Sequence, residues 1–307
     1  MTRALRGAAV ALAVAAWLAV GGYGLKSYAS HYYTYRGFSP PRDPPGVAPG
    51  HVREVKFFSP ALGQTRKYLI YLPAGYGAPS TTPKRYPVLY LLHGAPGHPR
   101  LFLNAGHFGV ALDTLVARHA IRPMLVVMPD GSDGTFRSDT EWANTRHGHY
   151  ENFVLDTVRA VDATWHTLPY RRDRAIAGLS EGAFAAVNVA LHHLATFGVA
   201  ESWSGYFEAS RGGAFKHASP QTRRHNSPTS YVAALAPRLH RLRLRAFIYT
   251  GDRDHQRAQV ERFVAQLRAA GGHVSFALYP GKHSWKLWRT QGPHMLRFTD
   301  RSFGPRA

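Results

Sequence analysis

A single serine stands at the centre of the pentapeptide Gly178-Leu179-Ser180-Glu181-Gly182. A short apolar segment typical of a strand, 174–177, precedes this pentapeptide, and a segment rich in Ala and Val and typical of a helix, 183–191, follows it. A G-x-S-x-G turn between a strand and a helix exposes the serine hydroxyl at a sharp bend. The pattern predicts that Ser180 is a nucleophile. The alternative is a glycine-rich turn in which the serine only caps the helix.

A serine hydroxyl becomes an effective nucleophile when an imidazole takes its proton and a carboxylate orients that imidazole. Downstream of Ser180, a strand-like segment at 245–250 ends in the loop Gly251-Asp252-Arg253-Asp254. Such a loop can direct a carboxylate toward the end of a sheet. Asp254 is the predicted acid and Asp252 is the alternative, although either aspartate could simply cap the helix expected at 256–270.

Four histidines follow Asp254, namely His255, His273, His283 and His294. Only His283 lies in a loop directly after an expected strand, which we place at 274–279. The chain contains 18 histidines, so residue type alone carries little weight and the assignment rests on position. His283 is the predicted general base.

Acyl chemistry also needs backbone donors for the negative charge that develops on the carbonyl oxygen. The amide of Glu181, directly after the nucleophile, is one predicted donor, and the amide of Ala95 in the loop 93–97 is the second. In that loop Gly94 permits a close approach of the backbone, and His93 is expected to shape the loop. The predicted substrate pocket consists of His93, Gly94, Glu181 and Trp285.

The sequence gives no sign of a bound metal ion or an organic cofactor. Histidines and carboxylates do not recur at the spacing of a metal site, and neither a phosphate-binding loop nor a dinucleotide fingerprint is present. The absence of cysteine excludes thiol catalysis and disulfides. The predicted ligand is an ester substrate alone.

The remaining chain alternates between strand-like and helix-like segments from Pro87 onward. This alternation predicts an α/β fold with a mostly parallel sheet covered by helices on both faces, after an antiparallel N-terminal hairpin. The expected strands are 52–59, 66–72, 87–92, 123–128, 174–177, 202–207, 245–250 and 274–279. The expected helices are 108–119, 149–168, 183–191 and 256–270.

Several motifs together resemble the esterase D family of α/β-hydrolases, which includes feruloyl esterases, enterochelin esterases, S-formylglutathione hydrolases and trehalose mycolyltransferases. The resemblance covers about 52–297 and implies an α/β-hydrolase fold, with the family's nucleophile, acid and base on Ser180, Asp254 and His283. It is carried by Leu91-Leu92-His93-Gly94, Val127-Met128-Pro129-Asp130-Gly131, Tyr150-Glu151-Asn152-Phe153, Ala177-Gly178-Leu179-Ser180, and Gly281-Lys282-His283-Ser284-Trp285 with Trp288.

The chain departs from the family directly after the nucleophile. Met-Gly-Gly commonly follows the serine there, whereas Glu181-Gly182-Ala183 stands here. The Glu181 side chain could steer a cationic or polyol substrate, pair with a pocket arginine, face solvent, or occupy the first turn of the following helix.

The N-terminus resembles a targeting segment. Arg3 and Arg6 precede a run without charged residues that ends at Lys26, and Ser27-Tyr28-Ala29 offers a small-x-small cleavage site. The run fits a cleaved signal or a membrane anchor equally well, and its basic start predicts that the rest of the chain is exported. We therefore expect a signal or anchor at 1–29, a Tyr- and Pro-rich linker at 30–51, and an extracytoplasmic catalytic domain at 52–307.

The chain carries a formal net charge of +20, which favours contact with anionic membrane or wall surfaces. Nucleic acid is disfavoured as a partner, because no nucleic-acid-binding motif accompanies the charge. The sequence predicts an exported serine esterase acting on a small-molecule, lipid or cell-envelope glycan ester. The alternatives are an acyltransferase to a sugar or lipid hydroxyl and a non-catalytic basic envelope-binding protein. The segments 131–148 and 211–230 are expected to build the substrate pocket.

Overall fold

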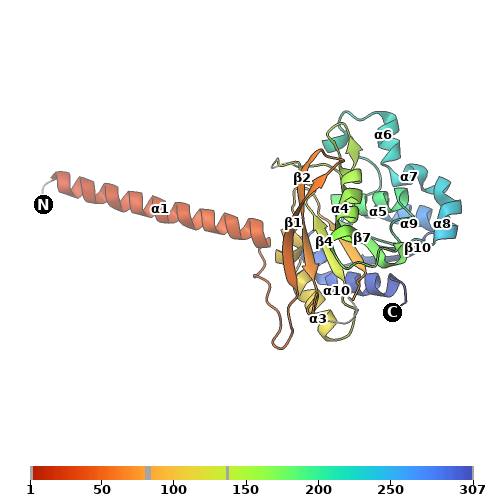
Figure 1. Ribbon diagram of the computed structural model, residues 1–307. Coiled ribbons are helices and arrows are strands. Elements are labelled where there is room, and N and C mark those ends of the chain that lie inside the picture. The colour runs from red at the N-terminus through yellow and green to blue at the C-terminus, as the bar shows by residue number, and fades with distance from the viewer. Residues whose placement is uncertain (1–2, 80–83, 136–137, 306–307) are drawn as a thin grey trace.

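The computed structural model describes residues 3–79, 84–135 and 138–305, without the side chains of 3–16, 18 and 19. An eight-stranded sheet forms the centre of the molecule (Figure 1). In spatial order its strands are β1 (His51–Ser59), β2 (Gln64–Leu72), β4 (Leu125–Pro129), β3 (Val88–Leu92), β7 (Arg174–Leu179), β8 (Val199–Trp203), β9 (Arg245–Gly251) and β10 (His273–Tyr279).

Strand β2 runs in the opposite direction to the other strands of the sheet. Strand β1 pairs antiparallel with β2, and β2 pairs antiparallel with β4, while β4, β3, β7, β8, β9 and β10 run parallel to one another. The predicted mostly parallel sheet with an antiparallel N-terminal hairpin is therefore confirmed. Because parallel strands end at the same edge, the loops after β3, β7, β9 and β10 meet there.

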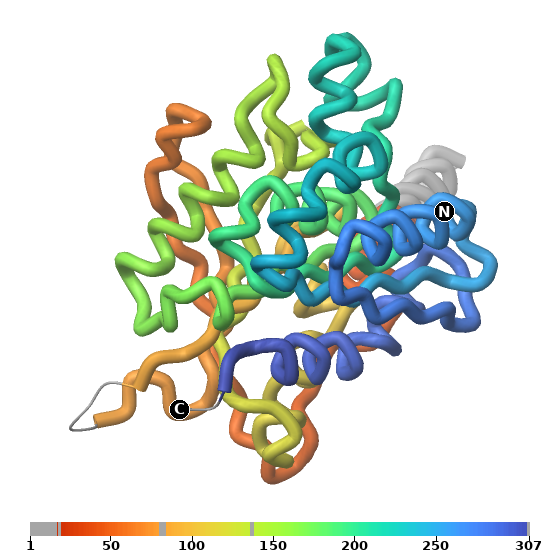
Figure 2. Tube along the Cα trace, turned by 90° about the vertical axis from the view of Figure 1, so that its right-hand side faces the viewer, coloured from red at the N-terminus to blue at the C-terminus, as the bar shows by residue number. Residues whose placement is uncertain are grey.

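Helices cover both faces of the sheet, as Figures 1 and 2 show. On one face the alternate strand residues Val88 and Tyr90 join a core with Phe153 and Phe263. This face is covered by α4 (Tyr150–Thr164), α5 (Glu181–His192), α8 (Ala236–Leu242) and α9 (Arg257–Ala269). Leu89 and its like-facing neighbours pack on the other face against α2 (Arg100–Asn104), α3 (Phe108–Ala117) and α10 (Trp285–Ser302).

Short elements complete the chain between these layers. They are the two-residue strands β5 (Asn144–Thr145) and β6 (Gly148–His149), the short helices α6 (Pro220–His225) and α7 (Pro228–Tyr231), and the 3-10 turns η1 (Arg171–Asp173), η2 (Gly213–Phe215) and η3 (Val232–Leu235). The first pair form a small separate hairpin directly before α4. Helices α6 and α7 belong to the segment 211–230.

Several elements differ from the expectation. The strand predicted at 202–207 lies earlier, at Val199–Trp203. The prediction missed its start because Glu201, which is fully buried, interrupts the apolar pattern of the sequence. The helix predicted at 149–168 ends at Thr164. Helix α10 was not predicted at all, since Pro293 inside it is atypical of a helix interior.

Helix α1 (Arg3–Tyr35) extends away from the catalytic body (Figure 1). It continues beyond the expected boundary at residue 29, so the irregular connection to β1 begins at Arg36 instead of Ser30. No helix among the described residues is long and apolar enough to cross a membrane. The targeting segment predicted at 1–29 falls largely on 1–19, where only the side chain of Trp17 lies within the described part.

Candidate active site

Ser180 occupies a sharp turn between β7 and α5. Its backbone has a φ of 56°, which is rare for a residue with a side chain and is typical of a nucleophile held at a strand-to-helix bend. The flanking glycines allow the chain to pass this closely. A Cβ on Gly178 would lie 2.2 Å from the carbonyl oxygen of Gly182, and a Cβ on Gly182 would lie 2.0 Å from that of Leu92. Any side chain at either position would displace the turn.

The structure brings the predicted serine, histidine and aspartate together. His283 Nε2 lies 2.9 Å from Ser180 Oγ, and His283 Nδ1 lies 3.0 Å from Asp254 Oδ2. Since a carboxylate only accepts, Nδ1 carries the proton and leaves Nε2 free to accept the serine proton. The indole of Trp288 packs edge-on against the imidazole, with ring centroids 5.0 Å apart.

The two aspartates of the loop after β9 have different roles in the structure. Asp254 is buried, and its Oδ1 accepts a hydrogen bond from the Gln256 amide. Although burial opposes it, the hydrogen bond with His283 helps to hold the pKa of Asp254 below its usual range. Asp252 is exposed and accepts a hydrogen bond from the Gly281 amide, 2.8 Å away, so it anchors the loop that carries His283.

Backbone donors and the loop after β3 surround the hydroxyl. Glu181 is the first residue of α5, so its amide has no partner within the helix and is available as a donor. Ala95 lies in the loop after β3, beside Ser180 on the same cavity. His93 Nε2 accepts a hydrogen bond from the Gly131 amide at 3.1 Å, and its Nδ1 lies 3.0 Å from the Gly94 carbonyl. Both ring nitrogens of His93 therefore hold the loop in place.

A cavity of about 220 Å³ opens at Ser180. Its walls are mostly apolar and include the predicted pocket residues His93, Gly94 and Trp285. The full lining is Arg36, His93, Gly94, Ala95, Pro96, Gly97, Leu101, Leu179, Ser180, His283, Ser284, Trp285 and Trp288. The cavity is small, because pockets for drug-sized ligands usually hold about 300 to 1,000 Å³.

The expectation for the segments 131–148 and 211–230 was wrong. Among the described residues, neither segment contributes to the lining of the cavity at Ser180. They meet instead at a separate cavity of about 690 Å³, which is lined by parts of 144–150 and 214–222. The sequence could not distinguish the two places, because both segments are polar and follow strands of the same sheet.

Comparison with known proteins identifies the family. The profile of the esterase family, described as "Putative esterase", matches residues 59–299. The chain belongs to the esterase family. Homologues in this family are carboxylic ester hydrolases, and the matched region of this chain contains Ser180, Asp254 and His283.

Individual relatives of this esterase agree with the family match. Over 242 residues it is 26% identical to an endo-1,4-beta-xylanase/feruloyl esterase of Xylanibacter ruminicola, which covers 78% of this chain and 30% of that protein. Over 151 residues it is 30% identical to an esterase of Mycobacterium tuberculosis, covering 49% of this chain and 31% of that protein. The chain thus spans about a third of the length of the curated relatives it matches.

Solved structures show the same fold. A ferulic acid esterase superposes with a TM-score of 0.75 at 25% identity, covering 83% of this chain and 99% of that one. The fluorophosphonate-binding serine hydrolase F of Staphylococcus aureus superposes with a TM-score of 0.69 at 19% identity, covering 82% and 99%. The α/β-hydrolase fold implied by the sequence resemblance is confirmed.

One cavity residue of this esterase lies in a segment that sequence reasoning assigned to a linker. Arg36 follows α1 directly, and its side chain lines the cavity beside Ser180. Its Nε is buried and has no hydrogen-bond partner within the described residues. No motif marks Arg36, because its place depends on how the N-terminal segment folds back onto the body.

A group of buried acidic side chains includes Glu181, the residue directly after Ser180. Glu181 and Glu141 are both buried, and the Tyr206 hydroxyl donates a hydrogen bond to Glu141 Oε2 at 2.5 Å. Burial, and next the neighbouring Glu141, raise the pKa of Glu181 well above its usual range. Burial likewise raises the pKa of Glu141 to about 8. Burial and the neighbouring acids therefore disfavour the charged form of the Glu181 carboxyl.

The Glu181 side chain does not lie where it could contact a substrate and select it by charge. It is neither exposed nor on the wall of the cavity at Ser180, although its backbone adjoins the nucleophile. We expect Glu181→Gln to change kcat/KM by nearly the same factor on matched neutral, anionic and aminoacyl esters, because the buried Glu181 side chain does not line the cavity at Ser180. A selective loss on the cationic ester alone would contradict this placement.

Proposed function

We propose that this protein is an exported serine esterase that forms an acyl-enzyme on Ser180. The single observation that carries the proposal is the continuous hydrogen-bonded chain from Ser180 Oγ through His283 to Asp254 Oδ2. Family membership supports an ester as the substrate. A scaffold protein that only bound anionic polymer would have no need for this alignment.

The geometry supports a two-step reaction. In the first step Ser180 Oγ attacks the ester carbonyl while His283 Nε2 takes its proton, and Asp254 stabilises the imidazolium. The amides of Glu181 and Ala95 donate to the oxygen that becomes negative. His283 then gives the proton to the departing alcohol. In the second step the same imidazole takes a proton from water, which attacks the acyl group. The imidazolium then returns this proton to Ser180 Oγ as the bond between Oγ and the acyl carbon breaks, and the acid leaves.

A fluorophosphonate probe tests the proposal directly. The probe reacts with a serine only when a neighbouring base activates it. We expect stoichiometric labelling of the full-length protein at Ser180 and none in Ser180→Ala. Labelling that persists in Ser180→Ala, or no labelling of the wild type, would rule out Ser180 as the nucleophile.

The cavity favours a small acyl group or a single aromatic ring. Its volume of about 220 Å³ is too small for a long, branched acyl chain. The indoles of Trp285 and Trp288 provide flat apolar walls. Relatives with feruloyl esterase in their names support hydroxycinnamoyl esters as candidates. We expect kcat/KM to be at least about tenfold higher on p-nitrophenyl acetate or methyl ferulate than on p-nitrophenyl palmitate. A preference for palmitate would contradict the argument from volume.

The export part of the proposal rests on the N-terminal sequence. Arg3 and Arg6 precede the uncharged run that ends at Lys26, and the positive-inside rule keeps such a basic start in the cytoplasm. Protease added to intact cells is therefore expected to digest the catalytic body. Complete protection in intact cells that is lost on lysis would contradict an extracytoplasmic location.

A further inference from the structure

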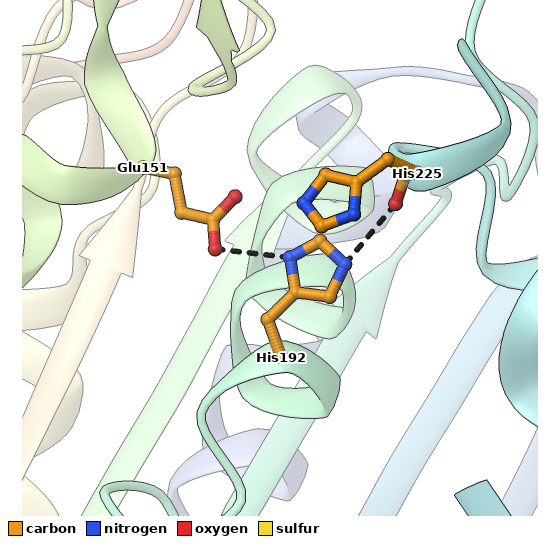
Figure 3. A group of neighbouring side chains, drawn as sticks. All are labelled: Glu151, His192 and His225. Carbon is orange, nitrogen blue, oxygen red and sulfur yellow. Dashed lines mark hydrogen bonds and ion pairs between the residues drawn. The ribbon is translucent and has the colours of Figure 1, made fainter. Parts of the chain in front are cut away.

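A second cluster of polar side chains lies outside the active site. Glu151 comes from the first turn of α4, His192 from the end of α5 and His225 from the end of α6 (Figure 3). One ligand atom from each of the three lies within 4.8 Å of the other two. None of these residues lines the cavity at Ser180. The proposed hydrolysis therefore gives no role to this cluster.

One carboxylate oxygen of Glu151 accepts hydrogen bonds, and the other has no hydrogen-bond partner among the described residues. Its Oε1 accepts hydrogen bonds from His192 Nδ1 at 2.9 Å and from His193 Nε2 at 2.7 Å. Its Oε2 is buried and has no hydrogen-bond partner among the described residues. The Glu151 residue is only 3% exposed. In Figure 3 the second carboxylate oxygen points toward the ring of His225. A buried carboxylate oxygen without a partner is costly unless a ligand completes it.

His192 is already held in an orientation suited to ligation. Its Nε2 lies 3.1 Å from the backbone carbonyl oxygen of His225, and this oxygen can only accept a hydrogen bond. The Nε2–H therefore donates to this carbonyl, and the other ring nitrogen, Nδ1, faces Glu151. A histidine that binds a metal commonly donates its other ring N–H to a carbonyl in this way.

His225 supplies the third group from the surface. Its ring stacks on that of His192, with centroids 4.3 Å apart, and the residue is exposed. The exposed side chain can turn until a ring nitrogen points between Glu151 and His192. On the outer side the cluster borders a cavity of about 610 Å³ whose lining includes His192, His225 and Tyr231.

We propose that Glu151, His192 and His225 bind one divalent transition-metal ion of the Zn²⁺ class. Two imidazoles and one carboxylate form a ligand set that Zn²⁺ accepts in tetrahedral geometry, with water in the fourth position. Glu151 Oε2, His192 Nδ1 and one ring nitrogen of His225 are the ligand atoms. The ion takes the place of the proton on His192 Nδ1, which is released to water, while His193 continues to donate to Glu151 Oε1.

The ion would connect two parts of the chain. His192 ends the helix that begins beside Ser180, and His225 belongs to the segment 211–230. Near the cluster, an amide hydrogen bond of 3.1 Å between Asn188 and Asn226 joins the same two parts. Metal binding should therefore stabilise the docking of 211–230 onto the body, because only the folded state brings the three ligands together.

The test uses full-length protein that has been stripped with a chelator. We expect calorimetric titration with Zn²⁺ to show one site per chain with a Kd of about 1 μM or below, and Zn²⁺ to raise Tm. Co²⁺ should give the visible absorption of a tetrahedral site. The variant His225→Phe keeps a stacked ring but removes the ligand nitrogens, and it should weaken Zn²⁺ binding at least about tenfold and abolish the rise in Tm.

A matched control separates this site from unspecific binding to the other histidines. His51→Ala removes an exposed histidine on β1 and should leave both readouts unchanged. Because His225 is exposed, His225→Phe should fold, and its esterase activity in the absence of metal reports that it has. The proposal is overturned if the wild type binds no Zn²⁺, or if His225→Phe binds it as tightly as the wild type.

Discussion

Replacing Ser180 or His283 with alanine should lower kcat/KM on a short-chain p-nitrophenyl ester by about three orders of magnitude or more. The reason is geometric, since Ser180 Oγ has its proton acceptor, His283 Nε2, at 2.9 Å. The double variant should lose little more than either single variant, because the two groups act as one unit. Steady-state kinetics on purified proteins would measure the effect. Activity retained by His283→Ala would overturn the assignment of the base.

The neighbouring aspartates offer a matched pair for the third member. Asp254→Ala removes the carboxylate that holds His283 Nδ1 and should also cost about three orders of magnitude. Asp252→Ala, two residues away, removes only the hydrogen bond to the Gly281 amide and should cost less than about tenfold. If Asp252→Ala were the more damaging change, Asp254 would not be the catalytic acid.

The sequence was sufficient to predict the sheet and the groups at its edge. The turn around Ser180 and the loops that hold Asp254 and His283 all follow apolar strands, and parallel strands bring such loops to one edge. The local sequence patterns were therefore enough to predict that these three residues lie close together. The spacing of the motifs and the family resemblance gave the same assignments for Ser180, Asp254 and His283.

Long-range packing explains what the sequence did not reveal. Arg36 enters the cavity because the segment after α1 folds back onto the body, and no local pattern reports such a return. The predicted pocket segments failed for the same reason, because polar composition does not say which cavity a loop lines. Glu201 obscured the position of β8, since a charged residue normally indicates an exposed position, whereas here its side chain is fully buried.

The burial of Glu201 leads to the second large expected effect, a dependence of stability on pH. Its Oε1 accepts a hydrogen bond from Thr299 Oγ1 at 2.5 Å, and its Oε2 accepts one from Trp203 Nε1 at 3.1 Å. Burial nevertheless raises the pKa of Glu201 to about 8 from its usual 4.5. The folded protein keeps this carboxyl protonated at neutral pH, while the unfolded chain releases the proton. The contribution of Glu201 to stability therefore falls as the pH rises from about 4.5 to about 8.

Glu201→Gln should remove this dependence and stabilise the protein. Glutamine has the shape of the neutral carboxyl, so its oxygen can accept from Trp203 and its amide can donate to Thr299. We expect the free energy of unfolding to rise by about 3 kcal/mol at about pH 7 and to change little at about pH 4. Urea unfolding at both pH values would measure the difference. Glu208→Gln is the control, because Glu208 is exposed and its replacement should have no effect at either pH. If Glu201→Gln proved equally stabilising or destabilising at both pH values, Glu201 would not be a buried neutral acid, and its two hydrogen bonds would have to hold it as a carboxylate.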